Sequence, residues 1–107
     1  MDIRNFFDGI EPPSKGERFD ILCKTRNLVI ERIVSSSDIT SEQYVQEQDE
    51  WVMLLRGQAV LLVDGEEVTL KEGDFLFIPA KTPHTVQKTS GDALWLAIHL
   101  HPESSER

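Results

Sequence analysis

The sequence has a single cysteine, few basic residues and no long apolar run. Cys23 excludes an internal disulfide, and its position in the apolar run 19–23 predicts a buried strand thiol. Lys and Arg total 11 against 19 Asp and Glu, so the formal net charge is -8, which opposes binding to phosphate backbones and anionic lipid headgroups. We therefore expect neither nucleic acid nor a membrane surface as a partner.

The sequence also shows no pattern of a membrane-spanning helix or of a secretory signal peptide. No apolar run approaches the roughly 20 residues that a membrane-spanning helix needs. Residues 1–5 lack the basic start and the apolar stretch of a secretory signal peptide, so the predicted compartment is the cytoplasm. A chain of 107 residues with 39% hydrophobic content supplies one core, and we expect a single domain.

Convincing helical patterns are absent, and short β-rich runs take their place. These runs are 19–23, 28–34, 51–55, 59–63, 68–70, 75–78 and 93–100. Turn signals separate them, and Asp64-Gly65 is the strongest because both residues tolerate the positive φ of a tight hairpin turn. Short strands with regular turns predict an all-β sandwich or barrel over residues 19–101.

The two ends of the chain differ from this central part. Residues 1–18 contain Phe6 and Phe7 ahead of a proline-glycine breaker and are predicted to form an N-terminal arm. The two aromatic rings should pack on the outside of the barrel or on a partner subunit, so a monomer and a homodimer both remain open. Residues 102–107 are predicted to form a polar tail.

The middle of the sequence carries two spaced motifs, one ending in a glutamate and a glycine and one running from a glycine to a histidine. The matching positions are Glu50, Gly57, Gly73, Pro79 and His84. Across residues 40–100 this pair resembles the motifs of the cupin family, and the chain is similar to small single-domain cupins of the RmlC-like superfamily. The resemblance implies a cupin double-stranded β-helix, a jelly-roll barrel that encloses a small pocket.

The sequence departs from the family pattern at four positions. Tyr44 and Gln46 stand where the first motif has its two histidines, while Lys81 and Lys88 replace a glycine and an asparagine of the second. The Tyr-X-Gln pattern ahead of Glu50 is typical of a subtype of small cupins. The two missing histidines are positions that bind the metal ion in the family.

In metal-bearing cupins, three imidazoles and one carboxylate hold a divalent ion such as iron, manganese, nickel or zinc. The resemblance implies that Gln46, Glu50 and His84 occupy three of these positions, with Tyr44 at the fourth. An amide oxygen and a protonated phenol bind such ions more weakly than imidazole does. We therefore expect a polar pocket at these residues, with either a divalent metal or none.

Each candidate also has a structural interpretation. Glu50 could be a solvated carboxylate, His84 a histidine that orients a loop, and Gln46 a strand residue bonded to the backbone. Trp51 should lie opposite Glu50, in the core or at an interface, since side chains alternate along a strand. Lys81 would either meet an anionic substrate at the pocket mouth or lie in solvent.

Three further candidates, Trp95, His99 and His101, share one face if the strand predicted at 93–100 continues to residue 101. If that face points inward, His99 adds an imidazole to the pocket and Trp95 lines it. Otherwise the two histidines cap the last strand near the surface.

Two hypotheses of function follow. The first is a cupin that binds a small polar ligand in the barrel, in one version as a metal-assisted enzyme with Glu50 and His84 holding the ion and Tyr44 as acid or hydrogen-bond donor. The alternative is a non-catalytic, metal-free module that binds or senses a ligand. A structural dimerisation domain is a third interpretation, and the sequence leaves enzymatic activity and ligand identity open.

Overall fold

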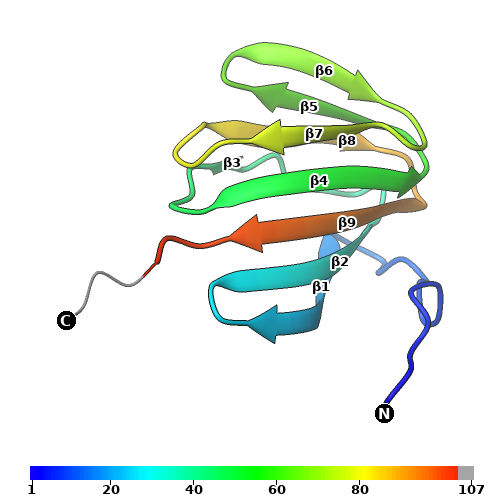
Figure 1. Ribbon diagram of the computed structural model, residues 1–107. Helices are drawn as coiled ribbons and strands as arrows, with labels where there is room; N and C mark the ends of the chain where they lie inside the picture. The colour runs from blue at the N-terminus through cyan, green and yellow to red at the C-terminus, as the bar shows by residue number, and fades with distance from the viewer. Residues whose placement is uncertain (104–107) are drawn as a thin grey trace.

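The computed structural model describes residues 1–103, which form two antiparallel β-sheets (Figure 1). The strands are β1 (Glu17–Thr25), β2 (Leu28–Ser35), β3 (Gln43–Tyr44), β4 (Asp49–Arg56), β5 (Ala59–Val63), β6 (Glu66–Leu70), β7 (Phe75–Ile78), β8 (His84–Thr89) and β9 (Ala93–Leu100). One sheet has the order β1-β2-β9-β4-β7 and the other β3-β8-β5-β6, so β1 and β3 are edge strands. The predicted all-β fold class is confirmed. The described residues contain no helix long and apolar enough to cross a bilayer.

All seven predicted runs contain strands, whereas β3 and β8 are not predicted by the sequence pattern. In β8 the apolar alternation is weak, because Gln87 and Lys88 are exposed, and the strand is held by antiparallel pairing with β5. The other missed strand, β3, has two residues and pairs with the start of β8. Pairing with neighbours, rather than local preference, therefore places both strands.

Two turns explain conspicuous glycines of the sequence. Asp64 with φ 50° and Gly65 with φ 83° form the hairpin between β5 and β6, as predicted. Gly57, the glycine of the first motif, has φ 91°, and a Cβ there would lie 2.5 Å from Oγ of Ser90 and 3.0 Å from Cα of Ala93. Only glycine fits where the end of β4 approaches the start of β9.

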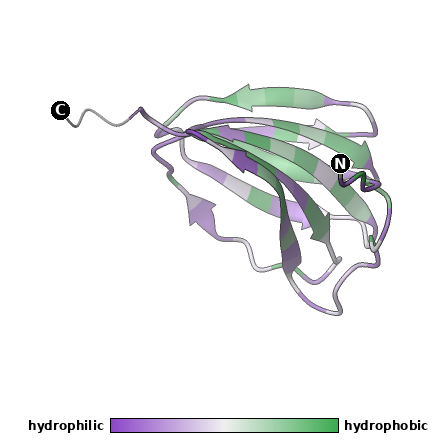
Figure 2. Cartoon of the chain, turned by 60° about the horizontal axis from the view of Figure 1, so that its bottom comes forward, coloured by the Kyte–Doolittle hydropathy of each residue, from purple (hydrophilic) through white to green (hydrophobic). Residues whose placement is uncertain are grey.

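The hydrophobic core lies between the two sheets and uses alternate residues of each strand. In β4, Val52 and Leu54 point inward and are 4% and 0% exposed, whereas Trp51 and Met53 point outward. From β9, Trp95 enters the same core at 2% exposed. Burying one such large apolar side chain stabilises the fold by about 1.5–3 kcal/mol. Hydrophobic residues accordingly concentrate on the strands (Figure 2).

The outer face of the five-stranded sheet carries exposed aromatic side chains. Phe75 and Phe77 of β7 are 62% and 57% exposed, and the ring of Trp51 lies 5.3 Å from that of Phe75. Trp51 therefore lies on the side of β4 opposite Glu50, as strand alternation predicts.

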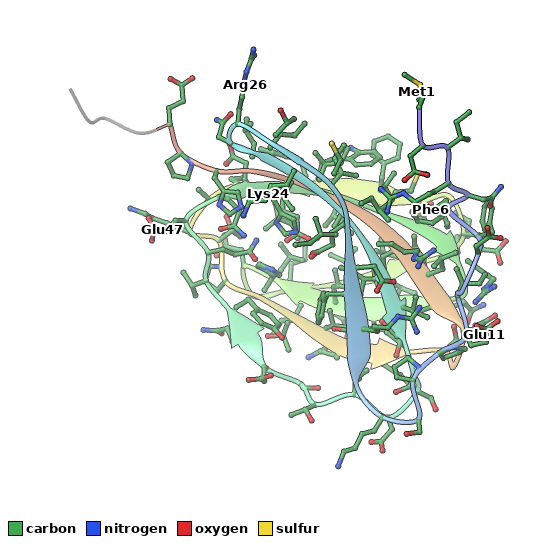
Figure 3. All side chains as sticks on the ribbon, turned by 90° about the horizontal axis from the view of Figure 1, so that it is seen from below. Met1, Phe6, Glu11, Lys24, Arg26 and Glu47 are labelled. Carbon is green, nitrogen blue, oxygen red and sulfur yellow. The ribbon has the colours of Figure 1, made fainter. Side chains whose placement is uncertain are left out.

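The N-terminal segment lies against the outside of β2. Nη1 of Arg32 donates hydrogen bonds of 2.6 Å and 2.7 Å to the carbonyl oxygens of Phe6 and Asp8, and its guanidinium carbon lies 5.9 Å from the Phe6 ring centroid. Figure 3 shows Phe6 on this segment, on the side of the molecule away from Glu47 in the loop before β4. Of the predicted tail, residues 104–107 lie outside the described residues.

Cys23 is exposed, so the prediction of a buried strand thiol is wrong. Its strand, β1, pairs on one side only, and the register with β2 shifts between Ile21 and Cys23. An apolar run predicts a strand here correctly, but at a sheet edge the end of the strand remains uncovered.

Candidate functional site

A cavity of about 120 Å³ lies between the two sheets and takes side chains from both of them. All six residues predicted to surround the pocket line it: Tyr44, Gln46, Glu50, His84, Trp95 and His99. Apolar side chains of the core form much of the remaining wall, including Val52, Leu61 and Ile78. The structure therefore brings the predicted constellation together at one place.

Glu50 enters the cavity from β4 and is 7% exposed. Nε2 of Gln46 donates a hydrogen bond of 2.9 Å to its Oε1 atom. The loop that carries Gln46 is fixed, because its carbonyl oxygen accepts a 2.6 Å hydrogen bond from the backbone N–H of Lys81. Next to Glu50, Oδ1 of Asp49 accepts a 2.8 Å hydrogen bond from the backbone N–H of Ala80. These bonds tie the first motif to the second, and Glu50 is not the solvated carboxylate of the alternative interpretation.

Lys81 has φ 65°, the left-handed conformation that glycine adopts most readily. This conformation explains physically why the family pattern has a glycine at this position. The Lys81 side chain is 70% exposed, and its Nζ atom lies 3.9 Å from Oε1 of Glu47. It does not line the cavity, and its exposure agrees with the interpretation of a solvated loop side chain.

His84 begins β8 and is 7% exposed. Its Nδ1 atom lies 3.0 Å from the carbonyl oxygen of Thr82, and since a carbonyl only accepts, Nδ1 carries the proton. In the neutral imidazole, Nε2 is then a free acceptor, and it lies 3.7 Å from Oε1 of Glu50. Tyr44 pairs with His84 across β3 and β8, with ring centroids 5.9 Å apart.

His99 also points inward, so the interpretation of a surface cap is wrong for this residue. It is 8% exposed, with Nε2 at 2.9 Å from Oε1 of Glu31 and Nδ1 at 3.3 Å from Nε2 of Gln48. The hydrogen bond with Glu31 raises the pKa of His99 above its ordinary 6.5, against the opposing effect of burial. His101 stacks on His99 with ring centroids 6.3 Å apart but does not line the cavity.

Sequence reasoning missed two acidic residues of the cavity, Glu17 and Glu31. The hydroxyl of Ser35 donates to the Glu17 carboxylate and accepts a 3.0 Å hydrogen bond from Nε1 of Trp95. Burial raises the pKa of Glu17, and the neighbouring carboxylates add to this effect. Strand alternation could have found Glu31, since it shares the inward face of β2 with buried Ile33.

As the side chains lie in this structure, the donor set is incomplete for a resident metal ion. Within residues 1–103 no group of three or more His, Cys, Asp or Glu side chains is arranged to hold one. The Nε2 atom of His99 is engaged with Glu31, and Gln46 presents its N–H to Glu50 rather than its oxygen. Burial raises the pKa of Tyr44, so its phenol stays protonated at neutral pH. Glu50 and His84 alone remain as donors, and two ligands do not make a transition-metal site.

Comparison with known proteins gives two relatives without an assigned role. The chain is 28% identical over 72 residues to an uncharacterised protein of Methanocaldococcus jannaschii, covering 67% of this chain and 56% of that protein. It is 41% identical over 61 residues to an uncharacterised protein of Aquifex aeolicus, covering 55% of this chain and 50% of that protein. The chain thus spans about half the length of the curated relatives it matches.

A solved structure from Ralstonia eutropha, described as a candidate mannose-6-phosphate isomerase, is similar along nearly the whole chain. It is 31% identical, covers 95% of this chain and 100% of that one, and superposes with a TM-score of 0.85. Residues 33–104 match the model of the cupin domain, a stretch that includes both motifs and most of the cavity. The chain belongs to the cupin family.

Proposed function

We propose that this cupin binds a small polar molecule without a phosphate group in the cavity between its sheets. Glu50, Gln46 and His84 would make the polar contacts. The observation that carries the proposal is the pair formed by Glu50 and His84. Both are 7% exposed, and their facing atoms are 3.7 Å apart without a hydrogen bond between them. No fully buried side-chain nitrogen or oxygen of the described residues lacks a hydrogen-bond partner, so the free Nε2 of His84 has access to the cavity, where a bound molecule would donate to it.

The size of the cavity limits the ligand. A volume of about 120 Å³ is small for a ligand site, which is typically about 300–1,000 Å³. A molecule of a few heavy atoms, or one end of a larger molecule, would fit between the sheets. The apolar walls would bury its carbon atoms, while the few polar side chains would fix its orientation.

The charge of the cavity argues against a sugar phosphate, the ligand that the description of the Ralstonia protein suggests. Glu17, Glu31 and Glu50 all line the cavity, and among the described residues no lysine or arginine does. A phosphate carries up to two negative charges and is usually bound by Arg, Lys or backbone N–H groups. Repulsion from three carboxylates would oppose it instead.

A metal-assisted enzyme is the second candidate, supported by the free Nε2 atom of His84 beside Glu50. It requires the amide of Gln46 to turn its oxygen toward an ion. Elemental analysis and a chelator distinguish the two candidates. About one metal ion per purified chain, together with a lower melting temperature after chelation, would support the metal-assisted enzyme.

Titration calorimetry tests the proposed binding. The probes are small alcohols, polyols, amides and amines of up to about six heavy atoms, together with phosphate esters of the same alcohols. We expect at least one uncharged or amine probe to bind the wild type, with binding lost in Glu50→Ala and retained in Glu67→Ala, an exposed glutamate of β6 outside the cavity. Tighter binding of the phosphate esters, equal binding by Glu50→Ala, or no binding by any probe would contradict the proposal.

A further inference from the structure

We infer that the ligand carries a positively charged amino group, which lies between Glu50 and His84, and an apolar substituent, which lies against Phe19 and Tyr44. The inference rests on the proposed function, because it specifies the chemistry of the molecule bound in the same cavity. Three features carry it: two facing acceptors, an excess of negative charge and an apolar rim.

The first feature is that Glu50 and His84 present acceptors to each other. With Nδ1 of His84 committed to the carbonyl oxygen of Thr82 at 3.0 Å, Nε2 of the neutral imidazole is left as an acceptor. It faces Oε1 of Glu50 at 3.7 Å, and no side chain or backbone donor of residues 1–103 reaches it. Both residues are more than nine-tenths buried, at 7% exposed each. Oε1 of Glu50 already accepts a hydrogen bond from Gln46 and, like Nε2 of His84, has lone pairs left for a donor in the cavity. A group that donates to both atoms would stabilise them.

The second feature is the charge of the cavity wall. Of the three carboxylates, Glu31 accepts a 2.9 Å hydrogen bond from His99, which offsets its charge when the imidazole is protonated. Glu17 and Glu50 accept hydrogen bonds from the neutral groups of Ser35 and Gln46, and Oε2 of Glu50 also lies 3.9 Å from Nε2 of His99. One imidazole thus lies beside two of the three carboxylates, and negative charge remains in excess on the wall. A cation is therefore the ligand charge that this wall compensates, and the interaction is stronger between the sheets than in water.

A primary ammonium group satisfies both features, since it donates three hydrogen bonds and carries one positive charge. A hydroxyl donates one hydrogen bond and leaves the carboxylates uncompensated. A carboxylate or phosphate adds repulsion. A transition-metal ion would find only Glu50 and His84 as free donors.

The third feature is an apolar rim on the two edge strands. Phe19 of β1 and Tyr44 of β3 both line the cavity and are 52% and 42% exposed. Ile21 and Val45, close to them in the chain, are 58% and 56% exposed. Exposed apolar side chains beside a cavity mark a binding surface. An alkyl or aryl substituent that emerges beside β1 and β3 would cover this rim.

The test compares three probes of nearly equal size: butylammonium, 1-butanol and butanoate. A heteronuclear NMR titration of the ¹⁵N-labelled protein reports both affinity and location, since Trp95 and Val86 line the cavity. We expect butylammonium to bind at least tenfold more tightly than 1-butanol, and butanoate not to bind. Glu50→Gln, which keeps the shape and removes the charge, should abolish this preference, whereas the exposed control Glu67→Gln should keep it.

A second variant tests the rim. Phe19→Ser should weaken butylammonium several-fold and leave methylammonium, which has no chain to reach the rim, unchanged. The amide spectrum of each variant shows whether it is folded before binding is compared.

The outcomes separate the inference from the proposed function. If 1-butanol binds in the cavity as tightly as butylammonium, the inferred charge is wrong and the proposed function stands. If butanoate binds most tightly, both the inference and the exclusion of anions are wrong. If Glu50→Gln keeps the preference, the ammonium does not lie at Glu50 and the inference fails. If no probe binds the folded wild type, the inference also fails, and the wider calorimetric panel decides separately on the proposed function.

Discussion

Strand β4 runs through two environments on one face. Leu54 is 0% exposed within the hydrophobic core, whereas Glu50, earlier in the same strand and on the same inward face, is 7% exposed at the polar cavity. The apolar end of the layer between the sheets is packed for stability. The polar end instead brings carboxylates and imidazoles to the wall of a cavity, an arrangement typical of sites that bind another molecule.

The largest expected effect comes from one substitution at each end of this inward face of β4. Leu54→Ala should lower the free energy of unfolding by about 2–5 kcal/mol, because it leaves a cavity in close-packed surroundings. Glu50→Leu should cost less, because the new apolar side chain packs next to Val52 and Ile78, while the N–H of Gln46 loses its acceptor. Urea denaturation of both variants measures this contrast. A loss in Glu50→Leu as large as in Leu54→Ala would show that the polar end is a structural element instead.

The second prediction concerns metal affinity at the polar end. Gln46→His should raise affinity for nickel or zinc by about tenfold or more, since imidazole is a much better donor to these ions than an amide. The gain requires the side chains of residues 46, 50 and 84 to converge, so it should disappear in the Gln46→His, His84→Ala double variant. Titration calorimetry measures both proteins. A folded Gln46→His protein that binds these ions no better than wild type would contradict the convergence.

The third prediction is a pH dependence of stability that originates at the polar end. Burial raises the pKa of Glu17 above its ordinary 4.5, so between that value and its raised pKa the folded state binds more protons than the unfolded chain. The hydrogen bond with Glu31 raises the pKa of His99 above its ordinary 6.5, with the same sign. Stability contributed by both groups is present at low pH and is lost as pH rises through each raised pKa.

Urea midpoints measured from pH 5 to pH 8 should therefore fall as the pH rises. Glu17→Gln should flatten the part of the curve that begins above pH 4.5, and His99→Gln the part that begins above 6.5. An unchanged slope in both variants would show that other groups control the pH dependence.

Much of the arrangement of the site could be predicted from the sequence, because it follows from the spacing of residues along the chain. Motif intervals and strand alternation place Glu50, Trp51 and His84 on the faces where the structure has them. Their role in binding stays a prediction. The sequence pattern did not reveal strand β8 or the cavity carboxylate Glu31. The position of each depends on which strands become neighbours in space.

Edge strand β1 shows a second feature that the sequence pattern does not predict, the exposure of a residue. An apolar run predicts that Cys23 belongs to a strand, but the pattern does not tell whether a second strand covers it. Exposure depends on sheet order, which local sequence does not record.

The smallest expected effect concerns the loop that holds the polar end in place. Lys81 has φ 65°, a conformation that disfavours a residue with a Cβ by about 1–2 kcal/mol, while glycine is more disordered in the unfolded chain by about 0.5–1 kcal/mol. Lys81→Gly should therefore raise the free energy of unfolding by up to about 1.5 kcal/mol. Its backbone N–H would keep the 2.6 Å hydrogen bond to Gln46. Lost contact with Glu47 should matter little, because both side chains are at least 70% exposed. The matched control is Lys88→Gly, an exposed position of β8 without positive φ, which should lower stability by about 0.5–1 kcal/mol. If both variants are destabilised equally, the left-handed backbone at residue 81 is not the reason that the family pattern places a glycine there.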